Sequence, residues 1–413
     1  MNILIIILFF SYFIIMTSFT MKYIEDKYVE KIIHYKYKGG DESILCKLVI
    51  DPFCNFTVNY FPKWLAPNVI TVSGWFLNLF NLIITTYYTG WKGGDYIPFW
   101  ACLACSIFYT TYIILDYSDG KQARRLNASS PLGLLIDHGT DACTTFYIAI
   151  VGGSITYYDN IYLYLLYYFP LICTFFMNTW EEYYKGELIL PIIHGVSEGT
   201  LYIAIAFIVS GIYGPSLSLK EFLLFNKYNL KLNEINGILI CFGAFLFCTK
   251  SVFGVLNTIK REQLLSAIKD ILIYILFSIT LLSVSFLTDS IIVKEYPKFI
   301  ILTFGFQFAK MMGILQLSHI LGSPYEVYKP VFLIPLFGLL IHSIIFYLTG
   351  HNLLVSTDAL IIAAFIWNVI SWAHYVYFCS EEICEILNIN RFVLGKKYSS
   401  RPSYEEIKKS KFA

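Results

Sequence analysis

Long apolar runs recur along most of this chain, and they restrict its possible folds more than any other feature. Stretches of roughly 17 to 25 residues with few charges follow one another between residues 69 and 378. An α-helix needs this length to cross the hydrocarbon core of a bilayer, and a helix satisfies its backbone polar groups internally. The sequence therefore predicts an all-α polytopic membrane protein.

About ten transmembrane helices are expected from these runs. The runs lie at residues 69–88, 98–115, 134–156, 161–179, 199–213, 235–253, 264–287, 299–321, 331–349 and 360–378. The composition agrees, because 57% of the residues are hydrophobic and only 14% are charged. A net charge of +1 offers no broad basic surface, so nucleic acid is excluded as an expected partner.

Five regions are predicted along the chain. They are an apolar N-terminal extension at 1–20, an interfacial segment at 21–66, catalytic helices at 67–213, additional transmembrane helices at 214–380 and a cytosolic tail at 381–413. The extension leaves three alternatives open: an extra span, a membrane-surface segment, or residues that precede Met21 as the true start. Lys411 and Lys409 are third and fifth from the end, as in a cytosolic dilysine retrieval signal, which predicts the endoplasmic reticulum or the Golgi as location.

Four carboxylates occur together in the stretch LDYSDGKQARRLNASSPLGLLIDHGTD. Asp116 and Asp119 are three residues apart at the end of one apolar run, so they share a helix face. Asp137 and Asp141 are four apart near the start of the next run, and they also share a face. A short connection makes the two helices antiparallel neighbours, so the four side chains are expected to converge at the cytosolic edge of the membrane.

Four like charges at a membrane edge repel one another unless cations hold them together. Oxygen ligands favour Mg²⁺ or Mn²⁺, and several carboxylates around one pocket suit two ions that bridge a diphosphate. Gly120 and Gly133 would leave room for that diphosphate, and Arg124 offers a planar donor group for its oxygens. The alternative is a solvated loop whose aspartates cap helices, but agreement of eight specified residues by chance is on the order of 10⁻⁸.

The same residues resemble the signature of the CDP-alcohol phosphotransferase family. The pattern is Asp-x-x-Asp-Gly-x-x-Ala-Arg, eight residues, then Gly-x-x-x-Asp-x-x-x-Asp, and its members here are Asp116, Asp119, Gly120, Ala123, Arg124, Gly133, Asp137 and Asp141. The segments DGKQARR, NASSPLG and DHG are similar to the choline/ethanolamine phosphotransferase branch. Four further segments resemble the same branch: YKYKGGDESILCKLVIDPF, WLAPNVIT, HGVSEGTLYIAIAFIVSGIYG and EEICEILNI. The resemblance therefore covers most of the chain after Met21.

This resemblance implies a membrane enzyme that transfers phosphoethanolamine or phosphocholine from CDP-ethanolamine or CDP-choline to diacylglycerol and releases CMP. The four aspartates would bind the metal ions, and Gly120, Ala123, Arg124 and Gly133 would line the donor site. Asn68 would lie beside the CDP moiety, although Pro67-Asn68 is also a helix-start signal. Glu198 would contact substrate, although a helix N-terminus attracts acids without any function. The subunits would pair as homodimers.

One position departs from the pattern of these relatives, which usually read Gly-Glu-Leu-Phe-Asp-His-Gly where this chain has GLLIDHG. The missing glutamate assists a histidine in those relatives, and Leu134 replaces it four residues before His138. We expect slow but real transfer, with His138 or Asp141 as the base, and a gain in rate from Leu134→Glu. Glu181 or Glu182 on another helix could substitute. An inactive or regulatory paralogue and a lipid or ion transporter are the alternative functions.

Overall fold

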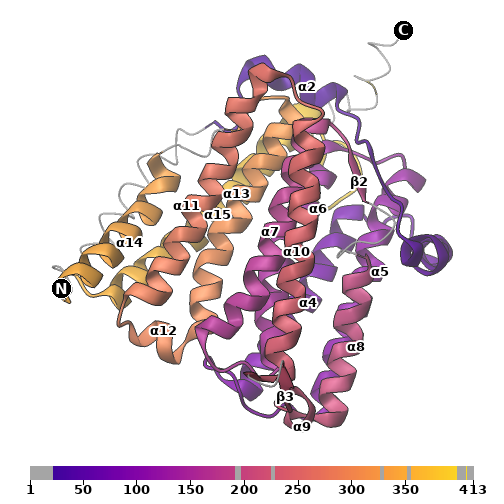
Figure 1. The fold of residues 1–413 in the computed structure, drawn as a ribbon. Helices are drawn as coiled ribbons and strands as arrows, with labels where there is room; N and C mark the ends of the chain where they lie inside the picture. The colour runs from indigo at the N-terminus through magenta and orange to yellow at the C-terminus, as the bar shows by residue number, and fades with distance from the viewer. Residues whose placement is uncertain are drawn as a thin grey trace.

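A computed structural model describes residues 22–190, 197–224, 228–325, 330–350 and 355–397, together with Glu406. The predicted extension at residues 1–20 lies outside this described part, as do Lys409 and Lys411. The long helices run side by side, with α14 at the left edge of Figure 1 and α8 at the right. The short elements gather at the two ends of this bundle: α2 and β2 at one end, and α9, α12 and β3 at the other.

Helices make up most of the described chain. They are α2 (Val29–His34), α3 (Asp51–Thr57), α4 (Pro67–Thr89), α5 (Phe99–Arg125), α6 (Pro131–Ile155), α7 (Ile161–Lys185), α8 (Ser197–Tyr213), α9 (Pro215–Ser218), α10 (Leu232–Leu256), α11 (Leu264–Leu287), α12 (Ile291–Glu295), α13 (Pro297–Leu321), α14 (Pro330–Thr349) and α15 (Thr357–Leu387). The last of these continues past residue 380, where the sequence predicted the start of the tail.

Seven helices of the described part are long and apolar enough to cross a membrane. These segments are Pro67–Thr89, Phe99–Arg125, Ile161–Lys185, Leu232–Leu256, Arg261–Leu287, Pro297–Leu321 and Thr357–Leu387. Glu198–Tyr213 and Pro335–Thr349 are shorter apolar helices, and α6 is long but carries charged side chains. The predicted all-α polytopic membrane class is therefore confirmed, whereas the count of about ten spans stays a prediction.

The helix α13 lies at the centre of the bundle, because 89% of its apolar window is buried. Only 11% of the corresponding window in α10 is buried, so α10 lies at the rim and faces the lipid. The helix α4 packs on α5 and α6, α5 packs on α8, and α6 and α7 also pack on α13. The helix α13 packs on α15 as well, so it joins the helices predicted to be catalytic to the additional ones.

The connection between α5 and α6 is short, as the sequence predicts. Ser130 caps α6, because its hydroxyl oxygen accepts a hydrogen bond from the Gly133 backbone N–H at 3.3 Å. Pro131 follows at the first helical position, where its missing N–H costs nothing. Asn127 has a positive φ of 53°, which lets the chain reverse within residues 126–130. The end of α5 and the start of α6 therefore lie at the same end of the bundle.

Two short strand pairs complete the fold. The strand β1 (Gly39–Asp41) pairs in parallel with β2 (Leu188–Leu190), with Gly39 opposite Leu188. The strand β3 (Glu221–Leu224) pairs antiparallel with β4 (Tyr228–Lys231), with Glu221 opposite Lys231. The first pair attaches the N-terminal segment to the chain that leaves α7.

The N-terminal segment is also tied to the end of α5. Arg125 Nη1 donates to the carbonyl oxygens of Val58 at 2.7 Å and Phe61 at 2.9 Å. Several large apolar side chains of this segment remain exposed, namely Ile44, Leu48, Val49, Phe53, Phe56, Tyr60 and Trp64. Such a surface favours the predicted position in the membrane interface.

Candidate active site

Three of the four predicted carboxylates meet where α5 and α6 lie together. One oxygen atom of each of Asp116, Asp137 and Asp141 lies within 4.8 Å of the others. Asp116 Oδ1 is buried and has no hydrogen-bond partner among the described residues. A cation would relieve the repulsion among three partly buried carboxylates at this separation, and an all-oxygen ligand set suits a hard divalent ion. The residues therefore fit a metal site.

The fourth carboxylate, Asp119, is buried and lies to one side of this group. Its Oδ2 accepts a hydrogen bond from the Thr71 hydroxyl of α4. Asp119 is still close enough to Asp116 and Asp137 for electrostatic repulsion. Its role as a metal ligand stays a prediction.

Tyr112 holds one of the converging carboxylates in place. Its hydroxyl donates to Asp141 Oδ1 at 2.8 Å, across from α5 to α6. Sequence reasoning missed both Tyr112 and Thr71. Tyr112 stands four residues before Asp116, so helical spacing places it on the same face and could have identified it. Thr71 comes from a different helix, and no spacing in the sequence connects it to Asp119.

The expected phosphate-binding residues surround the cluster with little packing of their own. A Cβ atom at Gly120 would meet only Arg124 Nη1, at 3.5 Å, among the described residues. A Cβ at Gly133 would lie 3.6 Å from Asn68 Oδ1. Ala123 is partly buried, and Arg124 and Arg125 are both exposed. The Arg125 guanidinium is bound to carbonyl oxygens of the N-terminal segment, whereas phosphate binding by Arg124 stays a prediction.

Asn68 lies at the start of α4, but it does not cap that helix. The helix begins at Pro67, and its N-cap residue is Ala66. The Asn68 Nδ2 group donates instead to the Arg391 carbonyl oxygen at 2.7 Å, 323 residues away in the chain. The pair Pro67-Asn68 thus marks a helix start, as the sequence signal predicts, but Asn68 is not the capping residue, and its contact with CDP stays a prediction. Glu198 lies in the first turn of α8 and is partly buried, and its contact with substrate is likewise a prediction.

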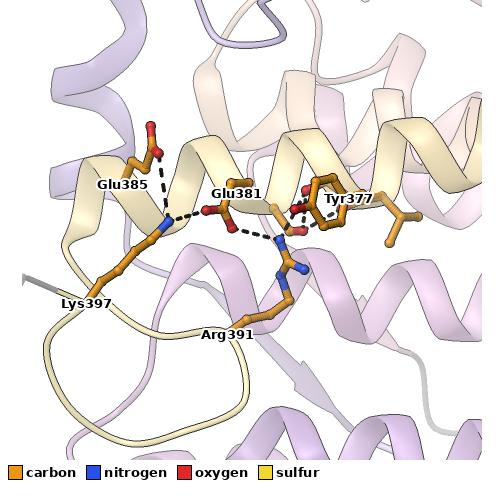
Figure 2. Close-up of polar contacts among 7 residues, drawn as sticks. Tyr377, Glu381, Glu385, Arg391 and Lys397 are labelled. Carbon is orange, nitrogen blue, oxygen red and sulfur yellow. Dashed lines mark hydrogen bonds and ion pairs between the residues drawn. The ribbon is translucent and has the colours of Figure 1, made fainter. Parts of the chain in front are cut away.

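The loop that carries Arg391 folds back on α15, as Figure 2 shows. Arg391 Nη2 lies 3.1 Å from both Glu381 Oε2 and the Tyr377 carbonyl oxygen. Lys397 pairs with Glu381 and lies 3.8 Å from Glu385 Oε1. These ion pairs close the loop and set the position of the carbonyl that Asn68 contacts.

The N-terminal segment also reaches the site. The Tyr35 hydroxyl lies 3.0 Å from His319 Nε2 of α13, and the Tyr117 hydroxyl donates to Asp41 Oδ2 at 2.7 Å. Desolvation, and then the negative charge of Glu182, raise the pKa of Tyr35 above its usual range. Tyr35 therefore stays a neutral phenol at the edge of the site.

His138, the predicted base, lies between two carboxylates. Its Nδ1 is 3.7 Å from Asp137 Oδ2, and its Nε2 is 3.5 Å from Glu182 Oε2. Glu181 instead pairs with Lys185 on the surface of α7. Of the two glutamates that the sequence left open, the structure thus places Glu182 beside the histidine.

Fold and site together define a polytopic helical membrane protein with a carboxylate cluster at one end of two adjacent helices. Residues 64–215, which run from the approach to α4 through α8, match the sequence profile described as CDP-alcohol phosphatidyltransferase. The choline/ethanolaminephosphotransferase 1 of Arabidopsis thaliana is 30% identical over 74% of this chain and 80% of its own length. The protein belongs to the CDP-alcohol phosphatidyltransferase family, as the sequence motif predicted.

Two other relatives extend the comparison. The choline/ethanolaminephosphotransferase 1 of Saccharomyces cerevisiae is 28% identical over 79% of this chain and 86% of its own length. The ethanolaminephosphotransferase 1 of Homo sapiens is 36% identical over 49% of this chain and 53% of its own length.

Proposed function

We propose that this protein transfers phosphoethanolamine, phosphocholine or both from the CDP-alcohol to diacylglycerol, giving a phospholipid and CMP. The convergence of Asp116, Asp137 and Asp141 beside His138 carries this proposal, because it puts a metal-binding carboxylate group next to a possible base. The names of the plant, yeast and human relatives support the same reaction class. Such a reaction needs one lipid substrate and one soluble substrate, which suits a site at the end of a membrane bundle.

The side chains of the site have distinct roles in this reaction. Mg²⁺ or Mn²⁺, held by Asp116, Asp137 and Asp141 with Asp119 nearby, would neutralise the diphosphate and the charge that grows on the departing CMP oxygen. Arg124 binds phosphate oxygens through its planar donor group.

Glycines and polar side chains position the donor beside this group. The bare backbone at Gly120 and Gly133 allows the diphosphate to approach the helices closely. Asn68 contacts the CDP moiety. The donor is thereby held with its phosphorus facing the acceptor hydroxyl.

His138 or Asp141 removes the proton from the free hydroxyl of diacylglycerol. The free hydroxyl of the lipid attacks the phosphorus that carries the amino alcohol, and the base accepts the hydroxyl proton as the bond to CMP breaks. His138 Nδ1 is buried and has no hydrogen-bond partner in the described part of the chain, so this nitrogen can receive a proton. Its closeness to Asp137 places it beside the metal-binding group.

The test is a turnover assay on the purified protein with labelled CDP-choline or CDP-ethanolamine, diacylglycerol and Mg²⁺. We expect a labelled phospholipid and stoichiometric CMP, and no product from Asp137→Ala. Absence of turnover with every CDP-alcohol would replace the proposal by an inactive or regulatory paralogue. Lipid or ion flux without release of CMP would favour a transporter.

We also propose that the protein resides in the endoplasmic reticulum or Golgi as a homodimer, with its active site facing the cytosol. The chain of apolar helices supports integral membrane insertion. If the tail is a retrieval signal, a variant with Lys409 and Lys411 changed to serine should leave its compartment. Imaging this variant tests the retrieval. The mass of the detergent-solubilised particle tests the homodimer.

A further inference from the structure

A fully buried glutamate lies between two histidines that come from different helices. Glu182 of α7 has no exposed surface, and its Oε2 lies 3.5 Å from His138 Nε2 of α6. Its Oε1 lies 3.7 Å from His319 Nε2 of α13, and it accepts from Gln316 Nε2 at 3.5 Å. Two helices, α6 and α13, thus bring polar side chains to one carboxylate of α7 inside the bundle.

Burial of this carboxylate is explained by its partners. A carboxylate removed from water is strongly unfavourable unless cationic or hydrogen-bond-donating groups face it. The imidazoles of His138 and His319 and the amide of Gln316 are such groups, whereas the neighbouring Lys185 pairs with Glu181. The Tyr35 hydroxyl lies 3.0 Å from the same His319 Nε2 atom and helps to fix that ring.

One helical turn before His138, the helix α6 carries Leu134. No carboxylate can therefore reach the histidine from that position of its own helix. The Leu134 side chain is partly buried and packs against an apolar cluster that includes Leu317 and Leu321 of α13. The carboxylate beside the histidine comes instead from α7.

We infer that Glu182 is a positioning residue for His138 and supplies a carboxylate from α7, since α6 carries Leu134 one turn before the histidine. This inference rests on the proposed transfer reaction. Glu182 Oε2 is the nearer of the two carboxylate oxygens that flank the ring, at 3.5 Å from Nε2 against 3.7 Å between Asp137 Oδ2 and Nδ1. We therefore expect the ring proton on Nε2 and the lone pair on Nδ1, which has no hydrogen-bond partner in the described part of the chain. In that part Glu182 pairs with His138, His319 and Gln316, so it acts through the orientation and tautomer of His138.

This arrangement changes the expectation for Leu134→Glu. In the wild type a second carboxylate would repel Glu182, so the variant should bring no gain in rate. In a protein that lacks the Glu182 charge, the same substitution restores a carboxylate one helical turn from His138. Comparing Leu134→Glu in proteins with and without the Glu182 charge therefore separates the positioning of His138 by Glu182 from a general role of Glu182 in packing.

The first experiment measures kcat and KM for CDP-ethanolamine. We expect Glu182→Gln to lower kcat about 100-fold while KM changes less than about twofold, because donor binding uses other side chains. Glu182→Gln with Leu134→Glu should recover about tenfold of that loss, and Glu182→Gln with Leu134→Gln should recover none. Glu181→Gln is the matched control and should behave as the wild type. Equal kcat values for Glu182→Gln and the wild type, or no difference between the two double variants, would overturn the inference.

The second experiment does not depend on turnover. Protein labelled with ¹⁵N-histidine is compared with the His138→Ala variant, which identifies the His138 signal among the seven histidines. The wild type should show His138 with its proton on Nε2, and Glu182→Gln should lose this preference while Mn²⁺ binding is retained. A proton on Nδ1, or an unchanged spectrum in Glu182→Gln, would refute the positioning role. Failure of the proposed function is recognised separately, by a wild type that binds CDP-ethanolamine without releasing CMP.

Discussion

Loss of a single hydroxyl from α5 should weaken metal binding at the carboxylate group. Tyr112 donates to Asp141 Oδ1 at 2.8 Å, so Tyr112→Phe removes this bond and leaves the ring in place. A hydrogen bond to a charged group contributes about 1.5–3 kcal/mol. Loss of a partner that orients a metal ligand lowers metal affinity about 10- to 100-fold, which corresponds to about 1.4–2.8 kcal/mol. The free energy of the lost hydrogen bond and the expected loss of metal-binding free energy thus cover the same range.

A Mg²⁺ titration of initial rates measures this effect directly. The Mg²⁺ concentration that gives half of the maximal rate should rise about 10- to 100-fold in Tyr112→Phe, with a smaller change in the rate at saturation. Tyr168→Phe is the matched control, because Tyr168 of α7 is buried and its hydroxyl has no hydrogen-bond partner among the described residues. A Tyr112→Phe protein whose titration matches that of the wild type, or an equal shift in Tyr168→Phe, would refute the reasoning.

Three further predictions concern the surroundings of the site. Asp119→Ala and EDTA should each abolish turnover without loss of expression, and EDTA-resistant turnover would contradict a metal requirement. Glu381→Gln should free the loop that Asn68 contacts and raise KM for the CDP-alcohol more than it lowers kcat. Glu385→Gln removes only the 3.8 Å ion pair with Lys397, so both constants should change little. Arg125→Ala should speed proteolysis within residues 39–65, because it removes three contacts with backbone carbonyls, and Arg124→Ala should lower activity at an unchanged proteolysis rate.

The sequence determined the fold class and indicated the three aspartates that converge, together with Asp119, which lies to one side. Apolar runs of membrane length leave a helix as the spanning structure, since unpaired backbone groups are too costly in lipid. Residues three or four apart on a helix share a face, so Asp116, Asp137 and Asp141 could be assigned to one site before any coordinates were known. The short connection with Ser130 and Pro131 made the two helices neighbours.

Only the tertiary structure decided which other helices contribute to that site. Helical spacing fixes the faces within one helix, but it does not specify which faces meet when helices pack in lipid. The contacts of Asn68 with the Arg391 carbonyl and of Asp119 with Thr71 therefore had no signal in the sequence, and for His138 the sequence left Glu181 and Glu182 as alternatives. Leu134 showed that a carboxylate was missing from α6, and the packing of α7 against α6 supplied another one in its place.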